Sequence, residues 1–213
     1  STFQNLKMSI KSGLSMGMCG IPWWNSDIGG FMNGDIESDS FRELIVRWFQ
    51  FGVFCPVMRL HGSRNRPSWH KDRHPGIIEP SAGDNEIWCF GERNYPILKD
   101  LIYLRERLKD YTCRYMEEAH KTGAPIMRPM FWEFPEDAVC YELEDQYFYG
   151  ADILFAPIYE EGVTERRVYL PEGTWIFTRD KTRVNGGQWI TCQAGLSEFI
   201  AFVRDGSDVI DCF

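Results

Sequence analysis

A change of pattern near Ala124 constrains the fold of this chain more than any other feature of its sequence. Before it, apolar residues recur at spacings of three and four, which is typical of amphipathic helices. After it, short runs of β-forming residues are separated by Gly, Pro and Asn, which is typical of an antiparallel sandwich. The strands predicted in this second part cover residues 126–131, 147–149, 153–158, 166–170, 174–177, 188–192 and 199–204. We therefore predict an α/β part over residues 1–123 and an all-β part over residues 124–213.

The first helix is predicted over residues 2–12, because Thr2 is a good N-cap and apolar residues follow it at helical spacing. It should break around its two glycines, Gly13 and Gly17. The same stretch matches G-x-S-x-G, the nucleophile elbow of esterases, but that elbow needs a strand before the serine and a helix after it. The order here is reversed. We therefore reject Ser15 as a nucleophile and expect small-residue packing at a helix end.

Two further helices are predicted before residue 124. Ser40 and Glu43 have the spacing of a capping box, in which each side chain satisfies a free backbone donor at the start of a helix. Pro96 suits the first turn of a long helix that should end at Gly123. Both helices carry an apolar stripe, so we expect them to pack against a sheet.

Two apolar segments, residues 20–26 and 53–60, read as buried parallel strands. The first is followed by Asp27 and a pair of glycines, and the second by His61 and a glycine. In β/α barrels, catalytic and binding residues lie where the strands give way to their following loops. The sequence therefore predicts a site that contains Asp27 and His61.

Aromatic residues surround Asp27 in the sequence, namely Trp23, Trp24 and Phe31. Flat apolar rings can pack against the C–H face of a sugar, and a carboxylate can accept hydrogen bonds from its hydroxyls. The alternative is that Asp and Gly simply end a strand while the aromatic rings fill the core.

A long connection over residues 63–90 is rich in Pro, Gly, Trp and charged residues. Loops of this length inside a compact protein are usually functional or disordered. Because Trp69, Trp88 and Phe90 lie in it, we predict an ordered loop that forms a wall of the site.

The composition excludes several classes of protein. A net charge of −8 is unsuited to general nucleic-acid binding, which needs a concentrated positive surface. Seven cysteines without a C-x-x-C pair fit neither a disulfide framework nor a zinc ribbon. Mostly buried free thiols favour a reducing, cytoplasmic compartment. No apolar run is long enough to span a membrane, and nothing indicates a metal or an organic cofactor.

Five short motifs, in this order, resemble the C-terminal part of the catalytic region of glycoside hydrolase family 31, which acts on α-linked sugars. They are SDIGGF at residues 26–31, RLHG at 59–62, RPMFWEFP at 128–135, DQYFYG at 145–150 and VYLPEGTW at 168–175. The resemblance implies the last units of a (β/α)₈ TIM barrel over residues 1–123 and a proximal antiparallel β-sandwich over residues 124–213.

The resemblance also implies the roles of four side chains. Asp27 and His61 match the family's residues that bind hydroxyls of the cleaved sugar, and Phe31 and Trp24 fall where members often place aromatic walls. The family's nucleophile and acid/base aspartates would both lie upstream of Ser1, so no catalytic residue is assigned here. Retaining hydrolysis needs both of these carboxylates.

The resulting hypothesis is that this chain is part of a retaining α-glycosidase. It would supply sugar-binding residues, take an α-linked oligosaccharide or glycoside as substrate, and pack against the remainder of its own barrel. The isolated chain of 213 residues should then be inactive. The alternative is a non-catalytic module that binds a carbohydrate or a partner.

Overall fold

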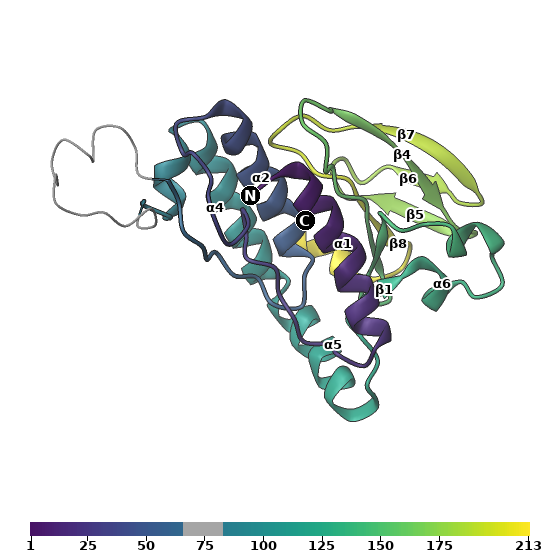
Figure 1. Cartoon of the computed structure of the whole chain (residues 1–213). Helices are drawn as coiled ribbons and strands as arrows, with labels where there is room; N and C mark the ends of the chain where they lie inside the picture. The colour runs from purple at the N-terminus through teal and green to yellow at the C-terminus, as the bar shows by residue number, and fades with distance from the viewer. Residues whose placement is uncertain (66–82) are drawn as a thin grey trace, which may run out of the picture.

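The computed structural model describes residues 1–65 and 83–213 of the chain. Helices form one side of the molecule and antiparallel sheets the other, with the first helix between them (Figure 1). In chain order, the helical elements before residue 124 are α1 (Phe3–Met18), α2 (Asp39–Val53), η1 (Ile87–Phe90), α4 (Asn94–Arg107) and α5 (Lys109–Thr122). The predicted combination of an α/β part and an all-β part is confirmed.

Six strands form one sheet in the order β1-β2-β3-β8-β5-β6, and β4 pairs with β7 in a second sheet. All of these pairings are antiparallel. The strands are β1 (Met127–Pro129), β2 (Tyr147–Tyr149), β3 (Ile153–Phe155), β4 (Glu165–Leu170), β5 (Thr174–Phe177), β6 (Arg183–Asn185), β7 (Gln188–Gln193) and β8 (Ala201–Arg204). Short helices complete this part: α6 (Met130–Glu133), η2 (Ala138–Tyr141) and η3 (Asp208–Cys212).

Helix α1 begins as predicted, because the side chain of Thr2 accepts a hydrogen bond from the backbone N–H of Asn5 (3.1 Å). The predicted break around the two glycines is wrong, since both lie inside the helix. A Cβ atom on Gly13 would lie 1.9 Å from the ring of Trp24. Glycine here serves close packing rather than a turn. Ser15 is an exposed residue in mid-helix, so the rejection of the nucleophile elbow is confirmed.

Two predicted features of the other helices are wrong. Helix α2 has no side-chain cap, and it begins one residue before Ser40, so Ser40 lies inside the helix and cannot be its N-cap. The Glu43 carboxylate accepts a hydrogen bond from Gly162 N (2.9 Å). The long helix predicted after residue 96 consists of two helices, α4 and α5, separated at Leu108. Its predicted end is confirmed, since Gly123 follows α5 with φ +80°.

Neither predicted strand of the first part forms a regular strand in the described residues. The backbone carbonyls of Val53, at the end of α2, and of Cys55 and Pro56, which follow it, accept hydrogen bonds from the Arg105 guanidinium instead of from a neighbouring strand (2.7–2.9 Å). Residues 20–26 and 53–60 still run side by side in the same direction. Val57 N donates to Trp24 O (3.2 Å). Further along both segments, Ile28 N donates to Arg59 O (3.1 Å).

The core consists of two apolar clusters. The first joins the helices to the inner face of the six-stranded sheet, where Phe51 and Phe54 of the α2 region contact Tyr147 and Phe155. The second lies between the two sheets, around Trp175. Because the first cluster spans both parts of the chain, the helices and the sheet hold each other in place.

All seven cysteines lie in the described residues and are free thiols. Three are buried, namely Cys55, Cys140 and Cys192, so the prediction that most of them are buried is wrong. Among the helices of the described residues, none is long and apolar enough to cross a membrane.

Candidate functional site

Asp27 follows the first of the two adjoining segments, and its side chain is only 17% exposed. Its Oδ1 atom accepts hydrogen bonds from Arg59 Nη2 (2.8 Å) and Nε (3.2 Å) and from Asn25 Nδ2 (3.3 Å). No described residue donates to its Oδ2 atom. The carboxylate is therefore fixed on one side by Arg59 and has acceptor capacity left on the other.

The loop that follows Asp27, residues 27–34, is folded around the buried guanidinium of Arg64; we call it the site loop. Arg64 donates to the backbone carbonyls of Ile28 (2.9 Å), Gly30 (2.8 Å) and Asn33 (3.1 Å). Burial lowers the pKa of Arg64 to about 10, and the nearby Asp27 carboxylate opposes that shift. Arg64 remains charged at neutral pH, and its charge strengthens each of these bonds.

Gly29 and Gly62 are required by this packing. Gly29 has φ +84°, and a Cβ atom there would lie 2.8 Å from Arg64 Nη2. Gly62 has φ +136°, and a Cβ atom would lie 2.6 Å from the carbonyl oxygen of Gly30. A side chain at either position would be strained; at Gly29 it would collide with Arg64, and at Gly62 with the site loop. The double glycine after Asp27 and the glycine after His61 therefore bring the two segments together.

Phe31 and His61 form an exposed pair. Their ring centroids are 5.6 Å apart with the planes inclined by 33°, and Phe31 is 58% exposed. Ser63 N donates to Phe31 O (2.7 Å), which ties the two segments beside the rings. The structure thus brings Asp27, Phe31 and His61 to one junction of two segments that are far apart in the sequence.

Trp24 lies differently from this pair. Its ring is half-buried, packs over Gly13 of α1, and faces Phe51 of α2 with centroids 6.4 Å apart. Its indole N–H is buried and has no partner among the described residues. This is the arrangement of a core side chain that supports the first segment from behind.

The long loop is described only in part. Trp69 lies outside the described residues, so its predicted role stays a prediction. Trp88 is 67% exposed, whereas Phe90 is fully buried and packs edge-on against Phe41 (6.1 Å between centroids). Phe90 therefore belongs to the core and not to an open wall.

Sequence reasoning missed Arg59 and Arg64 as parts of the site. The signal was available, because both lie within three residues of His61 and a buried carboxylate needs a cation. No group of three or more His, Cys, Asp or Glu side chains suited to a metal occurs in the described part of the chain.

Two family models cover the sequence. The glycosyl hydrolases family 31 TIM-barrel domain matches residues 1–114, and the glycosyl hydrolase family 31 C-terminal domain matches residues 123–209. The chain belongs to glycosyl hydrolase family 31. The family resemblance that the five motifs suggested is therefore confirmed.

Curated relatives of this family 31 chain are several times longer. It is 32% identical over 212 residues to Alpha-glucosidase 2 of Bacillus thermoamyloliquefaciens, covering 98% of the chain and 24% of the relative. It is 31% identical to the Alpha-xylosidase of Saccharolobus solfataricus, covering 95% of the chain and 25% of that protein. The chain thus spans about a quarter of their length.

Solved structures agree with this placement. A family 31 alpha-xylosidase from a soil metagenome, complexed with xylose, has a TM-score of 0.91 and 49% identity, covering 100% of the chain and 32% of the enzyme. A mutant dextranase of Flavobacterium johnsoniae complexed with isomaltotriose has a TM-score of 0.84 and 38% identity, covering 96% and 23%. The fold described above is therefore that of a segment of family 31 enzymes.

Proposed function

We propose that this chain is part of a retaining α-glycosidase and supplies sugar-binding side chains to its active site. In this proposal residues 1–123 belong to the catalytic barrel and residues 124–213 form the proximal sandwich. The observation that carries it is the junction described above, where Asp27 keeps free acceptor capacity beside the exposed rings of Phe31 and His61, in a chain of family 31. The substrate is an α-linked oligosaccharide or glycoside.

Each side chain has a defined task in this proposal. Asp27 accepts hydrogen bonds from sugar hydroxyls through Oδ2, since Arg59 occupies Oδ1. His61 exchanges a hydrogen bond with a further hydroxyl, and the Phe31 ring lies against a C–H face of the sugar. Trp24 supports this wall from behind rather than touching the sugar.

Asp27 is unsuited to act as the nucleophile. Two N–H groups of Arg59 donate to its Oδ1 atom, which stabilises the negative charge of the carboxylate and makes it a poorer nucleophile. Retaining glycosidases use two carboxyl groups about 5–5.5 Å apart. We assign both reacting carboxylates to barrel segments that precede Ser1, which fits the greater length of the relatives.

The partner of this chain is the remainder of its own barrel. Large apolar side chains are exposed on the two adjoining segments and on the site loop: Ile21 (45%), Trp23 (54%) and Val57 (40%) on the segments and Met32 (58%) on the loop. Exposed apolar side chains on two parallel segments suit contact with further barrel strands.

The substitution Asp27→Asn tests the proposed site in the polypeptide that carries this chain. A hydrogen bond from a hydroxyl to a charged acceptor contributes about 1.5–3 kcal/mol, so kcat/KM for a nitrophenyl α-glycoside should fall about tenfold to a hundredfold. Asp39→Asn is the matched control, because the Asp39 side chain is fully exposed and its carboxylate comes no nearer than 4.0 Å to the Arg42 guanidinium. An unchanged kcat/KM in Asp27→Asn would refute the assigned role.

Turnover by the isolated chain separates the enzyme from the alternative. We expect none, because the reacting carboxylates are assigned elsewhere. A non-catalytic carbohydrate-binding module would be favoured if the complete polypeptide also failed to hydrolyse α-glycosides while still binding them in calorimetry. Hydrolysis by the isolated chain would show that its own carboxylates react.

A further inference from the structure

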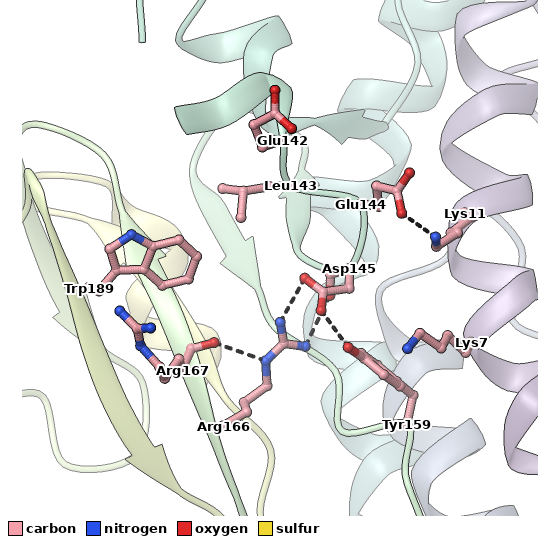
Figure 2. A pocket seen from close by; sticks show the side chains of 10 residues that line it. All are labelled: Lys7, Lys11, Glu142, Leu143, Glu144, Asp145, Tyr159, Arg166, Arg167 and Trp189. Carbon is pink, nitrogen blue, oxygen red and sulfur yellow. Dashed lines mark hydrogen bonds and ion pairs between the residues drawn. The ribbon is translucent and has the colours of Figure 1, made fainter. Parts of the chain in front are cut away.

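A polar cavity lies between helix α1 and the second sheet, away from the residues assigned above (Figure 2). Its volume is about 460 Å³, within the range of about 300–1,000 Å³ that is usual for small-molecule sites. Lysines of α1 lie on one side, residues 142–145 and Tyr159 form the middle, and β4 and β7 contribute arginines and Trp189 on the other side (Figure 2). We call it the Trp189 pocket.

The middle of the pocket is held rigidly. Asp145 Oδ1 pairs with Arg166 Nη2 (2.9 Å), while Tyr159 donates its hydroxyl proton to the other carboxylate oxygen. Arg166 also donates to the Asp145 carbonyl (3.0 Å). Figure 2 shows these three side chains pointing toward one another. Because their partners are fixed before any ligand arrives, the pocket is preorganised.

Trp189 forms the aromatic side. It is 42% exposed and lies directly across from Tyr169 in the β4–β7 pair, with ring centroids 5.4 Å apart. The Arg167 guanidinium carbon lies 4.8 Å from the Trp189 ring centroid. Trp189 is therefore held at the edge of the pocket by its two neighbours while much of its surface stays accessible.

The charges of the pocket nearly cancel. Asp145 neutralises Arg166, and Glu144 pairs with Lys11. Among the remaining lining groups, Arg167 and Glu142 carry opposite charges, and Lys7 pairs with Glu160 (3.8 Å) and lies over the Tyr159 ring, 4.8 Å from its centroid. A phosphate would need a clear excess of cations and a metal ion a cluster of anions, and neither is present among these described side chains. The lining instead offers many donors and acceptors beside one indole, which suits a neutral ligand rich in hydroxyls.

We propose that the Trp189 pocket binds one or two units of a neutral sugar chain, with a C–H face of one sugar against the indole and its hydroxyls on Arg167, Glu142 and Lys7. The inference rests on the proposed function only in taking α-linked oligosaccharides as the ligand. Neither Asp27 nor His61 lines this pocket in the described residues. A sugar chain held here stays near the protein after a terminal unit is released, which raises its effective concentration.

Calorimetric titration of the 213-residue chain with maltoheptaose and with isomaltoheptaose tests this proposal. Trp189→Ala removes the indole and should weaken binding of at least one of them about tenfold or more. Trp132→Ala is the matched control, because Trp132 is 40% exposed and does not line the pocket. Trp189→Phe retains a ring and should bind with an affinity between those of the parent and Trp189→Ala.

The outcomes are separable from those of the proposed active site. Asp27→Asn reports on that site in the same titration, so either site can fail while the other stands. The pocket proposal is overturned if the parent binds neither sugar, if Trp189→Ala binds as the parent does, or if Trp132→Ala loses as much affinity. Thermal melting of each variant checks that it folds. If Trp189→Ala does not fold, Glu142→Gln, at an exposed position, provides a second test of sugar binding.

Discussion

Replacing Arg64 by methionine removes the guanidinium around which the site loop is folded while keeping an apolar stem of similar length. Arg64 is completely buried, and two of the carbonyls that it binds, those of Ile28 and Gly30, form buried hydrogen bonds with it. Loss of the guanidinium leaves both carbonyls without this donor. The variant therefore tests whether the loop depends on this one side chain.

The cost follows from these contacts. An unsatisfied buried carbonyl costs about 1–3 kcal/mol, so the two together cost about 2–6 kcal/mol. The variant no longer pays the desolvation cost of burying the guanidinium charge, which offsets part of this penalty. The net loss in the free energy of unfolding is about 3 kcal/mol. A chain of this length loses about 2–4 °C of melting temperature per kcal/mol, so Arg64→Met should melt about 6–12 °C below the parent.

Differential scanning calorimetry gives the melting temperature, and sugar titration of the same sample shows whether Asp27 and Phe31 still bind. Arg64→Lys should lie between the parent and Arg64→Met, because one ammonium cannot reach all of the carbonyls that a guanidinium reaches. Arg93→Met, at an exposed arginine, is the control and should melt like the parent. If Arg64→Met melted within about 2 °C of the parent, the loop would not depend on Arg64 and the reasoning would be refuted.

Two further predictions concern packing and pH. Gly13→Ala should lower the free energy of unfolding by about 1–3 kcal/mol despite the better helix propensity of alanine, because its Cβ would lie 1.9 Å from the Trp24 ring. Gly195→Ala is the control, since a Cβ atom there would meet no atom nearer than 3.5 Å. A stabilised Gly13→Ala would contradict the prediction. Thermal stability should also fall above about pH 10, since burial raises the pKa of Tyr149 to about 12 and also raises that of Tyr147. The unfolded chain then ionises first, at its ordinary tyrosine pKa, and the loss continues up to the folded value. A melting temperature that stayed constant from pH 9 to about pH 12 would contradict this.

The all-β part could be predicted from the sequence because its strands are short, apolar and separated by turn residues. The predicted bounds of β2 and β5 agree with the structure, and β4 and β7 differ by one residue at one end. β6 was missed, since Arg183–Asn185 is three residues long and contains only one apolar side chain. A strand of that kind forms because β5 lies beside it, and its own sequence carries no such signal.

The first part was less predictable, and its errors have a common physical cause. Residues 20–26 and 53–60 are apolar enough to read as strands, but apolarity predicts burial and not which donors the backbone carbonyls receive. The position of Asp27 and His61 at the junction of two parallel segments followed from the glycines beside them. The side chains that hold the junction together, Arg59 and Arg64, did not follow, because their partners are backbone carbonyls and a carboxylate distant in sequence.

Buried arginines explain how irregular segments can form a defined site without a strand ladder between them. Every buried carbonyl needs a donor, and a segment outside a helix or sheet must find one elsewhere. A guanidinium offers five N–H donors in a fixed plane, so one side chain can satisfy several carbonyls of a curved loop. Arg64 does this for the site loop, and Arg105 does it for the residues after α2. In this chain the buried arginines therefore define the shape of the site as much as the glycines beside Asp27 and His61 do.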